Sequence, residues 1–352
     1  MTSPSSNSGP LSAHTSRRSR SRVAIVATVT LASLILGACS STGGRPRDTA
    51  GNGNGGGGVD TPRYTVSMVS HGAPGDTFWD LVRAGAEDAA KKDNLELRYS
   101  STPQAPDQAN LVQNAIDAKS DGIALTMPTA EALGPVAKKA VDQGIPVVGL
   151  NSGMDNYKKY GLSAFFGQDE STAGAEAGKR LGADKAHKVL CVIHEQGNPS
   201  QEARCSGIQK GLKASGSDGK VETLYVNGMD LTAVQSTIQA KLAQDKDVDR
   251  VMGLVAPVAL AAVKSREAAG SHAKISTFDT NAELVTAIKK GDVDWAADQQ
   301  PYLQGYMAID ALWLAKRNGS TVGGGQPVFT GPSFVDKSNV DKIEDAAKKG
   351  LR

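Results

Sequence analysis

Two kinds of segment alternate along the chain from residue 64 onward, and this alternation restricts the possible folds more than any other feature. Short apolar runs rich in β-branched residues are each followed by a longer segment in which apolar residues recur at helical spacing. Strands and helices that alternate in this way form right-handed βαβ units with parallel sheets, so we predict an α/β fold. The predicted strands are 64–70, 95–99, 122–126, 146–150, 164–167, 188–193, 221–226, 250–255, 274–278 and 295–297.

The predicted helices fill the intervals between these strands. They are 78–92, 107–118, 130–143, 172–181, 203–214, 231–243, 258–269 and 281–290. The alternation restarts near residue 172, so the chain contains two successive sets of elements. The folded part, about 290 residues, is long enough for two lobes rather than one core. We expect each lobe to be a doubly wound parallel sheet.

The N-terminal region carries the features of an exported lipoprotein. Arginines cluster between positions 17 and 22, and residues 23–37 are uncharged. This pattern is typical of a signal peptide, and its apolar segment is shorter than the roughly twenty residues that span a membrane. The Leu-Gly-Ala directly before Cys39 resembles the bacterial lipobox, whose cysteine is acylated, for example with palmitate. We predict a signal peptide over residues 1–38; the arginine pair opening the basic cluster leaves both Sec-type and twin-arginine export open.

The segment after the lipidated cysteine is a predicted tether. Residues 39–61 are rich in glycine, with an uninterrupted run at 55–58, and contain almost nothing apolar. Such a segment buries too little surface to offset its ordering entropy, so it stays flexible. Acyl chains would hold the folded domain near the bilayer. We therefore expect the protein to be lipid-anchored at the cell membrane, on its extracytoplasmic face.

The net charge and the cysteines indicate which binding partners and which disulfide are possible. The full chain carries a net charge of +2, and the N-terminal arginines supply more than that, so the mature domain is mildly acidic and unsuited to nucleic acid. Cys191 and Cys205 remain after lipidation, and export permits a disulfide between them. Closing that loop would stabilise the fold by roughly 3 kcal/mol. The alternative is two unrelated buried thiols.

No pattern of catalytic or metal-binding residues is present. His71, His194 and His272 are scattered, and no His or Glu stands at the helical spacing of a metal-binding pair. Catalysis needs a nucleophile with its base, a metal cluster or paired carboxylates. The glycine run at 55–58 lacks the Lys-Ser/Thr ending of a phosphate loop. We therefore predict a protein that is not an enzyme and has no metal and no cofactor.

Polar side chains gather where the predicted strands end. In a doubly wound sheet the ligand site lies outside the carboxyl ends of the strands. The segments at these ends are 71–79, 151–152, the loop from 193 to Arg204, Asp279, and 298–301. They combine planar polar groups with two adjacent aromatic residues. Polar groups and aromatic rings together are the side chains needed to bind a polyhydroxylated ring.

Four sets of short motifs make the chain resemble the ribose/galactose-type periplasmic sugar-binding proteins, which serve ABC importers. They are Asp-Thr-Phe-Trp at 76–79, Asp-Gly-Ile at 121–123 with Gly-Ile-Pro-Val-Val at 144–148, Phe-Asp at 278–279, and Asp-Gln-Gln-Pro-Tyr-Leu-Gln-Gly at 298–305. The resemblance covers nearly all of residues 64–352. It implies the type I periplasmic binding protein fold.

That fold joins two lobes by a hinge of three crossings. The resemblance implies crossings near 167–168, 299–300 and 329–332. The N-terminal lobe would then comprise residues 62–167 plus 300–330, and the C-terminal lobe 168–299 plus 331–352. Closure of the lobes on a ligand would be a hinge motion.

The resemblance also implies ligand-binding roles for seven residues. They are Asp76, Phe78, Trp79, Asn151, Arg204, Asp279 and Gln299. The aromatic pair would face the C–H side of a sugar ring, while the carboxylates, amides and guanidinium would bind its hydroxyls. Asp76 is also placed to cap the first helix. Alanine at Arg204 or Asp279 is expected to remove most binding and leave the unliganded fold stable.

Two departures from the family pattern disfavour simple ribose binding. Ser152 stands where the ribose type carries arginine, and Ala-Pro-Val at 256–258 stands where the family often has an Asn-Asp pair. The expected function is nevertheless a monomeric solute-binding lipoprotein that delivers a sugar, sugar alcohol or cyclitol to an ABC permease and its ATPase. The alternative is a ligand sensor of the same fold that docks on a membrane signalling receptor.

Overall fold

The computed structural model describes residues 62–352. The predicted signal peptide, the lipidation at Cys39 and the tether over residues 39–61 lie outside the described residues. No helix in the described part of the chain combines the length and apolar character needed to cross a membrane.

The described chain forms two six-stranded sheets, which confirms the predicted α/β class with two doubly wound sheets. The first sheet has the order β11-β5-β4-β3-β1-β2 and the second the order β12-β10-β9-β8-β6-β7. All pairings are parallel except that of β12, which runs antiparallel to β10. The strands of the first sheet are β1 (Tyr64–Ser70), β2 (Leu95–Ser101), β3 (Gly122–Leu125), β4 (Val147–Leu150), β5 (Phe165–Gly167) and β11 (Pro327–Phe329). Those of the second are β6 (Lys188–Ile193), β7 (Lys220–Tyr225), β8 (Arg250–Gly253), β9 (Lys274–Phe278), β10 (Trp295–Asp298) and β12 (Ser333–Asp336).

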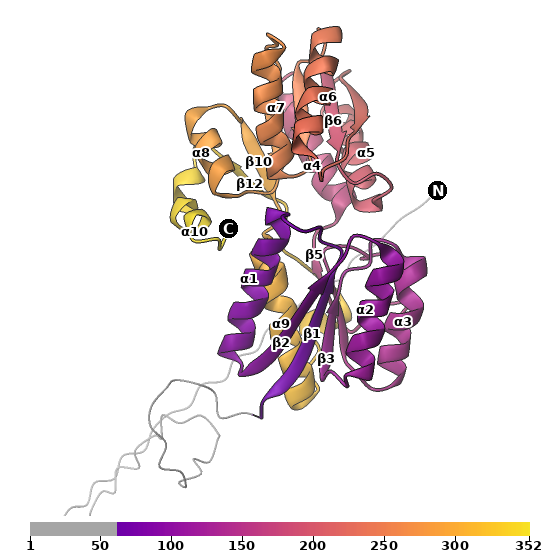
Figure 1. Ribbon diagram of the computed structural model, residues 1–352. Coiled ribbons are helices and arrows are strands. Elements are labelled where there is room, and N and C mark those ends of the chain that lie inside the picture. The colour runs from indigo at the N-terminus through magenta and orange to yellow at the C-terminus, as the bar shows by residue number, and fades with distance from the viewer. Residues whose placement is uncertain (1–61) are drawn as a thin grey trace, which may run out of the picture. The chain divides into compact units, whose positions relative to one another are not determined.

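Helices cover both faces of each sheet (Figure 1). On the first sheet, α1 (Thr77–Lys92) and α9 (Pro301–Asn318) pack on one face, and α2 (Ala105–Asp117) and α3 (Ala130–Asp142) on the other. On the second, α4 (Glu170–Ala183) and α5 (Pro199–Ala214) pack on one face, and α6 (Leu231–Gln244), α7 (Ala256–Ala268) and α8 (Ala282–Lys290) on the other. Three short helices complete the chain: η1 (Val322–Gly325), η2 (Val340–Lys342) and α10 (Glu344–Lys348).

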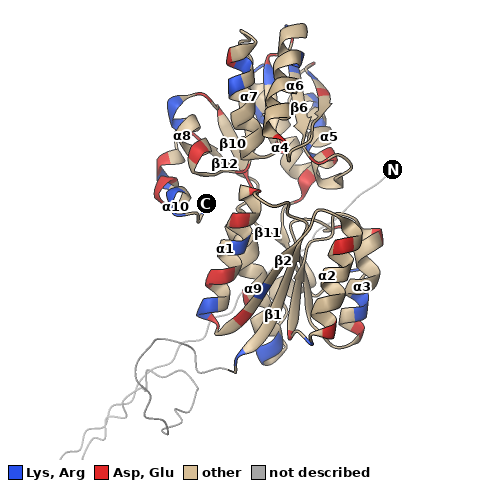
Figure 2. Ribbon diagram, viewed as in Figure 1, with Lys and Arg blue, Asp and Glu red and all other residues tan. Residues whose placement is uncertain are grey.

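The central strands are apolar on both faces because both faces are covered. Every residue of β3, β4 and β8 is buried, as parallel sheets between helical layers require. Charged residues sit mainly on the helices, while the strands are mostly uncharged (Figure 2). Because both faces of these strands are buried, the strands appear in the sequence as continuous apolar runs rather than as alternating apolar and polar residues.

The chain passes between the two sheets three times. It leaves the first sheet after β5 and returns after β10 to form α9, and it crosses again between β11 and β12. The three passages run through residues 168–169, 299–300 and 330–332.

The structure differs from the predicted elements in two places. Helix α9 and strands β11 and β12 were not anticipated, although Pro301 at the start of α9 and Gly319 just after its end are ordinary helix-boundary residues. The helix after β6 was predicted to begin at residue 203, with the preceding loop reaching Arg204. Helix α5 instead begins at Pro199 after the cap Asn198, so the loop is shorter and Arg204 lies well inside the helix rather than at its start.

Candidate functional site

The polar ends of strands from both sheets meet at one pocket, called here the inner pocket. All seven residues predicted for the site line it: Asp76, Phe78, Trp79, Asn151, Arg204, Asp279 and Gln299. Its other lining residues are His71, Ser152, His194, Glu195, Asn198, Ser200, Gln201, Leu254 and Val255. The parallel topology accounts for this convergence, since the carboxyl ends of parallel strands share one edge of a sheet.

The start of α1 supplies one carboxylate and two aromatic rings. Asp76 caps the helix by accepting a hydrogen bond from the backbone N–H of Phe78 at 3.0 Å. Burial raises the pKa of Asp76 to about 6. The rings of Phe78 and Trp79 meet edge to face at 5.1 Å between centroids, and His71 contacts Trp79 in the same way at 4.7 Å. Packing therefore fixes the orientation of both aromatic rings beside the pocket.

Asn151 and Asp279 occupy equivalent places in the two sheets. They follow β4 and β9, which hold the same position in the two strand orders, and both have a φ of 61°. Asn and Asp tolerate this left-handed conformation better than other side-chain-bearing residues. The sharp turn lets each side chain project past the end of its strand.

Gln299 joins these two residues. Its side-chain NH₂ donates to Asp279 Oδ2 at 3.0 Å, and its Oε1 accepts from Asn151 Nδ2 at 3.2 Å. Asp279 is 3% exposed, and burial raises its pKa to about 7. The unliganded carboxyl is therefore only partly ionised near neutral pH.

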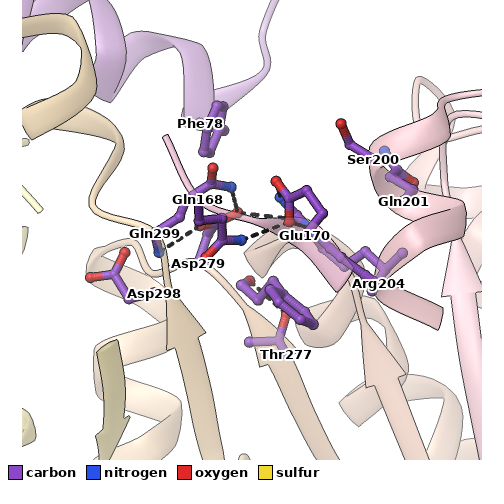
Figure 3. Close-up of polar contacts among 12 residues, drawn as sticks. Phe78, Gln168, Glu170, Ser200, Gln201, Arg204, Thr277, Asp279, Asp298 and Gln299 are labelled. Carbon is purple, nitrogen blue, oxygen red and sulfur yellow. Dashed lines mark hydrogen bonds and ion pairs between the residues drawn. The ribbon is translucent and has the colours of Figure 1, made fainter. Parts of the chain in front are cut away.

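Arg204 is held by an ion pair that the sequence did not reveal. Its Nε and Nη2 donate to the two carboxylate oxygens of Glu170, at 2.6 and 2.9 Å, in the bidentate geometry that guanidinium favours (Figure 3). Its Nη1 donates to the carbonyl oxygen of Leu254 at 3.1 Å and lies 3.9 Å from Asp279 Oδ2. The guanidinium also lies over the ring of Phe278, 4.7 Å from its centroid. Arg204 is thus 5% exposed and fixed on several sides.

Close packing of α4 against α5 brings Glu170 to Arg204. A Cβ atom on Gly211 would lie 2.0 Å from the carbonyl oxygen of Ala175, and one on Gly178 would lie 2.1 Å from that of Ile208. Glycine at these positions lets the two helix backbones touch. The predicted disulfide is present in the structure: Cys191 on β6 and Cys205 on α5 are joined, with 5.9 Å between their Cα atoms. It anchors α5 beside Arg204.

Several residues that line the inner pocket or support it were not predicted from the sequence. Glu170 was placed just outside a predicted helix, and the shortened prediction for α5 hid its cap Asn198 and the buried Gln201. Gln201 accepts the backbone N–H groups of His194 and Glu195 through Oε1, at 3.0 and 3.2 Å. The signal available was Asn-Pro at 198–199, a typical helix start. Within residues 62–352 no group of three or more His, Cys, Asp or Glu is arranged to hold a metal ion.

Comparison with known proteins identifies the family. The periplasmic binding protein domain matches residues 66–320. The chain belongs to the periplasmic binding protein family. Among solved structures, it is similar to a carbohydrate transporter from Acidothermus cellulolyticus 11B in complex with myo-inositol. The two are 48% identical with a TM-score of 0.80, over 83% of this chain and 100% of that one.

Two curated sugar-binding proteins are more distant relatives. The ribose import binding protein RbsB of Bacillus subtilis is 25% identical over 299 residues, covering 82% of this chain and 91% of the relative. A D-ribose/D-allose-binding protein of Pseudomonas aeruginosa is 26% identical over 256 residues, covering 68% of this chain and 77% of the relative.

Proposed function

We propose that this periplasmic binding protein captures an uncharged or cationic polyhydroxylated molecule in the inner pocket and delivers it to an ABC-type importer. The observation that carries the proposal is the convergence of seven complementary side chains on one pocket. Phe78 and Trp79 offer an apolar wall for ring C–H groups. Asp279 accepts hydroxyl protons, and the amides of Asn151 and Gln299 both donate and accept.

The charge of the inner pocket argues against anionic ligands. Its single guanidinium, Arg204, is already neutralised by the two oxygens of Glu170. Asp279 then adds a further acidic group, and desolvating an anion beside it would be unfavourable. Phosphorylated sugars and sugar acids are therefore poor candidates. Sugars, sugar alcohols and cyclitols remain.

A cyclitol is the first candidate within this class. The solved relative that is 48% identical was crystallised with myo-inositol. The local sequence agrees, because Ser152 replaces the arginine typical of ribose binders. Since α7 begins at Ala256, with Val255 as its cap residue, an apolar segment follows β8 where the family often carries an Asn-Asp pair.

The three passages between the sheets would act as a hinge between an N-terminal lobe (62–167 plus 300–330) and a C-terminal lobe (168–299 plus 331–352). Buried side chains tie these passages together. Gln304 Nε2 donates to Gln299 Oε1 at 2.9 Å and to Thr330 Oγ1 at 3.2 Å, and the Thr330 N–H donates to the Gly167 carbonyl at 2.7 Å. Gln299 therefore connects the ligand pocket to all three passages.

The export features complete the proposal. A signal peptide over 1–38 and acylation of Cys39 would anchor the protein on the extracytoplasmic face of the cell membrane, where it would act as a monomer with a permease and ATPase. It would be a binding protein without enzyme activity, and the sensor role remains the alternative. Loss of uptake when the protein is deleted would support the importer role.

A thermal-shift screen against sugars, sugar alcohols, cyclitols and amino acids tests the binding proposal. A ligand at a hundred times its dissociation constant stabilises the folded state by about 2.7 kcal/mol, which raises the melting temperature by several degrees. Stabilisation by a polyhydroxylated compound, lost in Asp279→Ala, is the expected result. Stabilisation by amino acids alone would contradict it.

A further inference from the structure

A second and larger cavity, called here the outer chamber, adjoins the inner pocket. Its volume is about 670 Å³. The residues shared by the two cavities are His71, Asp76, His194, Glu195, Asn198 and Val255. A group attached to a ring in the inner pocket would therefore pass into the outer chamber between these residues.

The outer chamber is acidic. Asp76, which precedes the first passage between the sheets in the sequence, and Glu195, which follows it, both line the outer chamber. Neither carboxylate forms an ion pair within residues 62–352. No Lys or Arg of the described chain is among its lining residues. Burial raises the pKa of Asp76 to about 6, and the nearby carboxylate of Glu195 adds to this rise. Two carboxylates thus share a cavity without a cation.

The two histidines at the junction do not supply the missing charge. Burial lowers the pKa of both, that of His194 to about 4, so each imidazole is neutral at pH 7. The Glu195 carboxylate accepts a hydrogen bond from Asn198, which is a neutral donor. Although burial opposes it, His71, His194, the hydrogen bond from Asn198 and the guanidinium of Arg204 together lower the pKa of Glu195, so this carboxylate is ionised. No Lys or Arg within residues 62–352 forms an ion pair with it.

His71 gives an independent sign of a ligand at this place. It is 6% exposed, and its Nδ1 lies 2.8 Å from Thr126 Oγ1. That oxygen already accepts N–H groups from the His71 backbone and Gln108, both at 3.1 Å, so its own proton goes to Nδ1. The ring proton then resides on Nε2, which has no partner in the described chain. His71 lines both cavities, so this N–H is available to an acceptor on a ligand.

We propose that the outer chamber receives an ammonium group carried by the ligand, so that the ligand class is an amino-substituted polyol, such as an aminocyclitol or amino sugar. Asp76 and Glu195 would accept from the ammonium, and His71 Nε2–H would donate to an adjacent hydroxyl oxygen. The ring of Tyr225, which also lines the chamber, offers a face to a cation. This assignment rests on the polyol-binding function proposed for the inner pocket.

Matched ligand pairs test this assignment on the full-length protein by calorimetry. The pairs are myo-inositol against an inosamine, and glucose against glucosamine. Charge-assisted hydrogen bonds are roughly twice as strong as neutral ones, so the amino member of the preferred pair should bind about tenfold more tightly. This preference should shrink at high ionic strength, as an electrostatic effect does.

Glu195→Gln is the informative variant and Glu267→Gln its control, since Glu267 is exposed near the end of α7 and lines neither cavity. The ratio of amino to neutral affinity should collapse toward one in Glu195→Gln and persist in Glu267→Gln. Equal or weaker binding of the amino compounds by the wild type would overturn the ammonium assignment while leaving the polyol function standing. Failure of every polyol to bind would refute both.

Discussion

Asp279 shows how burial prepares a single residue for a ligand. Its carboxyl has a pKa near 7 instead of the usual value of about 4, because burial disfavours the charged form. The folded state therefore binds a proton that the unfolded state releases between about pH 4 and about pH 7, and stability falls as the pH rises through that window. A ligand that donates hydroxyl hydrogens would relieve this cost.

Asp279→Asn should remove this pH dependence. The melting temperature of the unliganded wild type should fall relative to that of the variant between about pH 4 and about pH 7, because the amide never ionises. Scanning calorimetry across this range makes the comparison. Asp142→Asn, which alters an exposed carboxylate on α3, is the control and should follow the wild type. Parallel curves for wild type and Asp279→Asn would show that Asp279 carries no such cost.

Arg204 differs from Asp279 because it also supports the fold. The sequence predicted that Arg204→Ala would leave the unliganded fold stable, but the buried ion pair with Glu170 leads us to replace that expectation. Removing one partner strands a buried charge, which costs about 3–5 kcal/mol of unfolding free energy. Urea denaturation should show this loss in Arg204→Ala. The double variant with Glu170→Gln should recover part of it, and no recovery would contradict the ion-pair account.

At the scale of elements, the contact between α4 and α5 controls the site. Gly211→Ala would place a Cβ atom 2.0 Å from the Ala175 carbonyl oxygen, so the helices must separate. Overpacking of this kind costs about 1–3 kcal/mol. We expect lower stability in urea and weaker ligand binding, because Arg204 and Glu170 lie on the separating helices. Lys210→Ala, at the neighbouring exposed position, should change neither; a Gly211→Ala variant as stable as wild type would refute the close contact.

The sequence was sufficient to predict elements whose signal is local. Continuous apolar runs identified the strands that are buried on both faces, and helical spacing identified α1 to α8. Strands β11 and β12 were missed because each is very short and only partly buried, and their place in the sheets depends on the rest of the fold. The same distinction between local and long-range signals holds for the binding site. Residues at strand ends were predicted from the sequence, whereas the contact between Glu170 and Arg204 depends on the packing of α4 against α5.

At the scale of the whole molecule, the inner pocket is assembled from segments separated by up to about two hundred residues, and hydrogen bonds through Gln299 and Gln304 link it to the three passages between the sheets. Each side chain alone has an ordinary structural role. Asp76 caps a helix, and Arg204 pairs with Glu170. Only their convergence indicates a binding site, which is why the central claim concerns the pocket as a unit.

Isothermal titration of wild type and Asp279→Asn with myo-inositol and the strongest polyol from the thermal screen tests that claim most directly. The account predicts saturable one-site binding by the wild type, weakened at least about thirtyfold in the variant because charge-assisted hydrogen bonds are lost. Saturable binding that Asp279→Asn leaves unchanged, or no binding of any polyol by the wild type, would contradict the account.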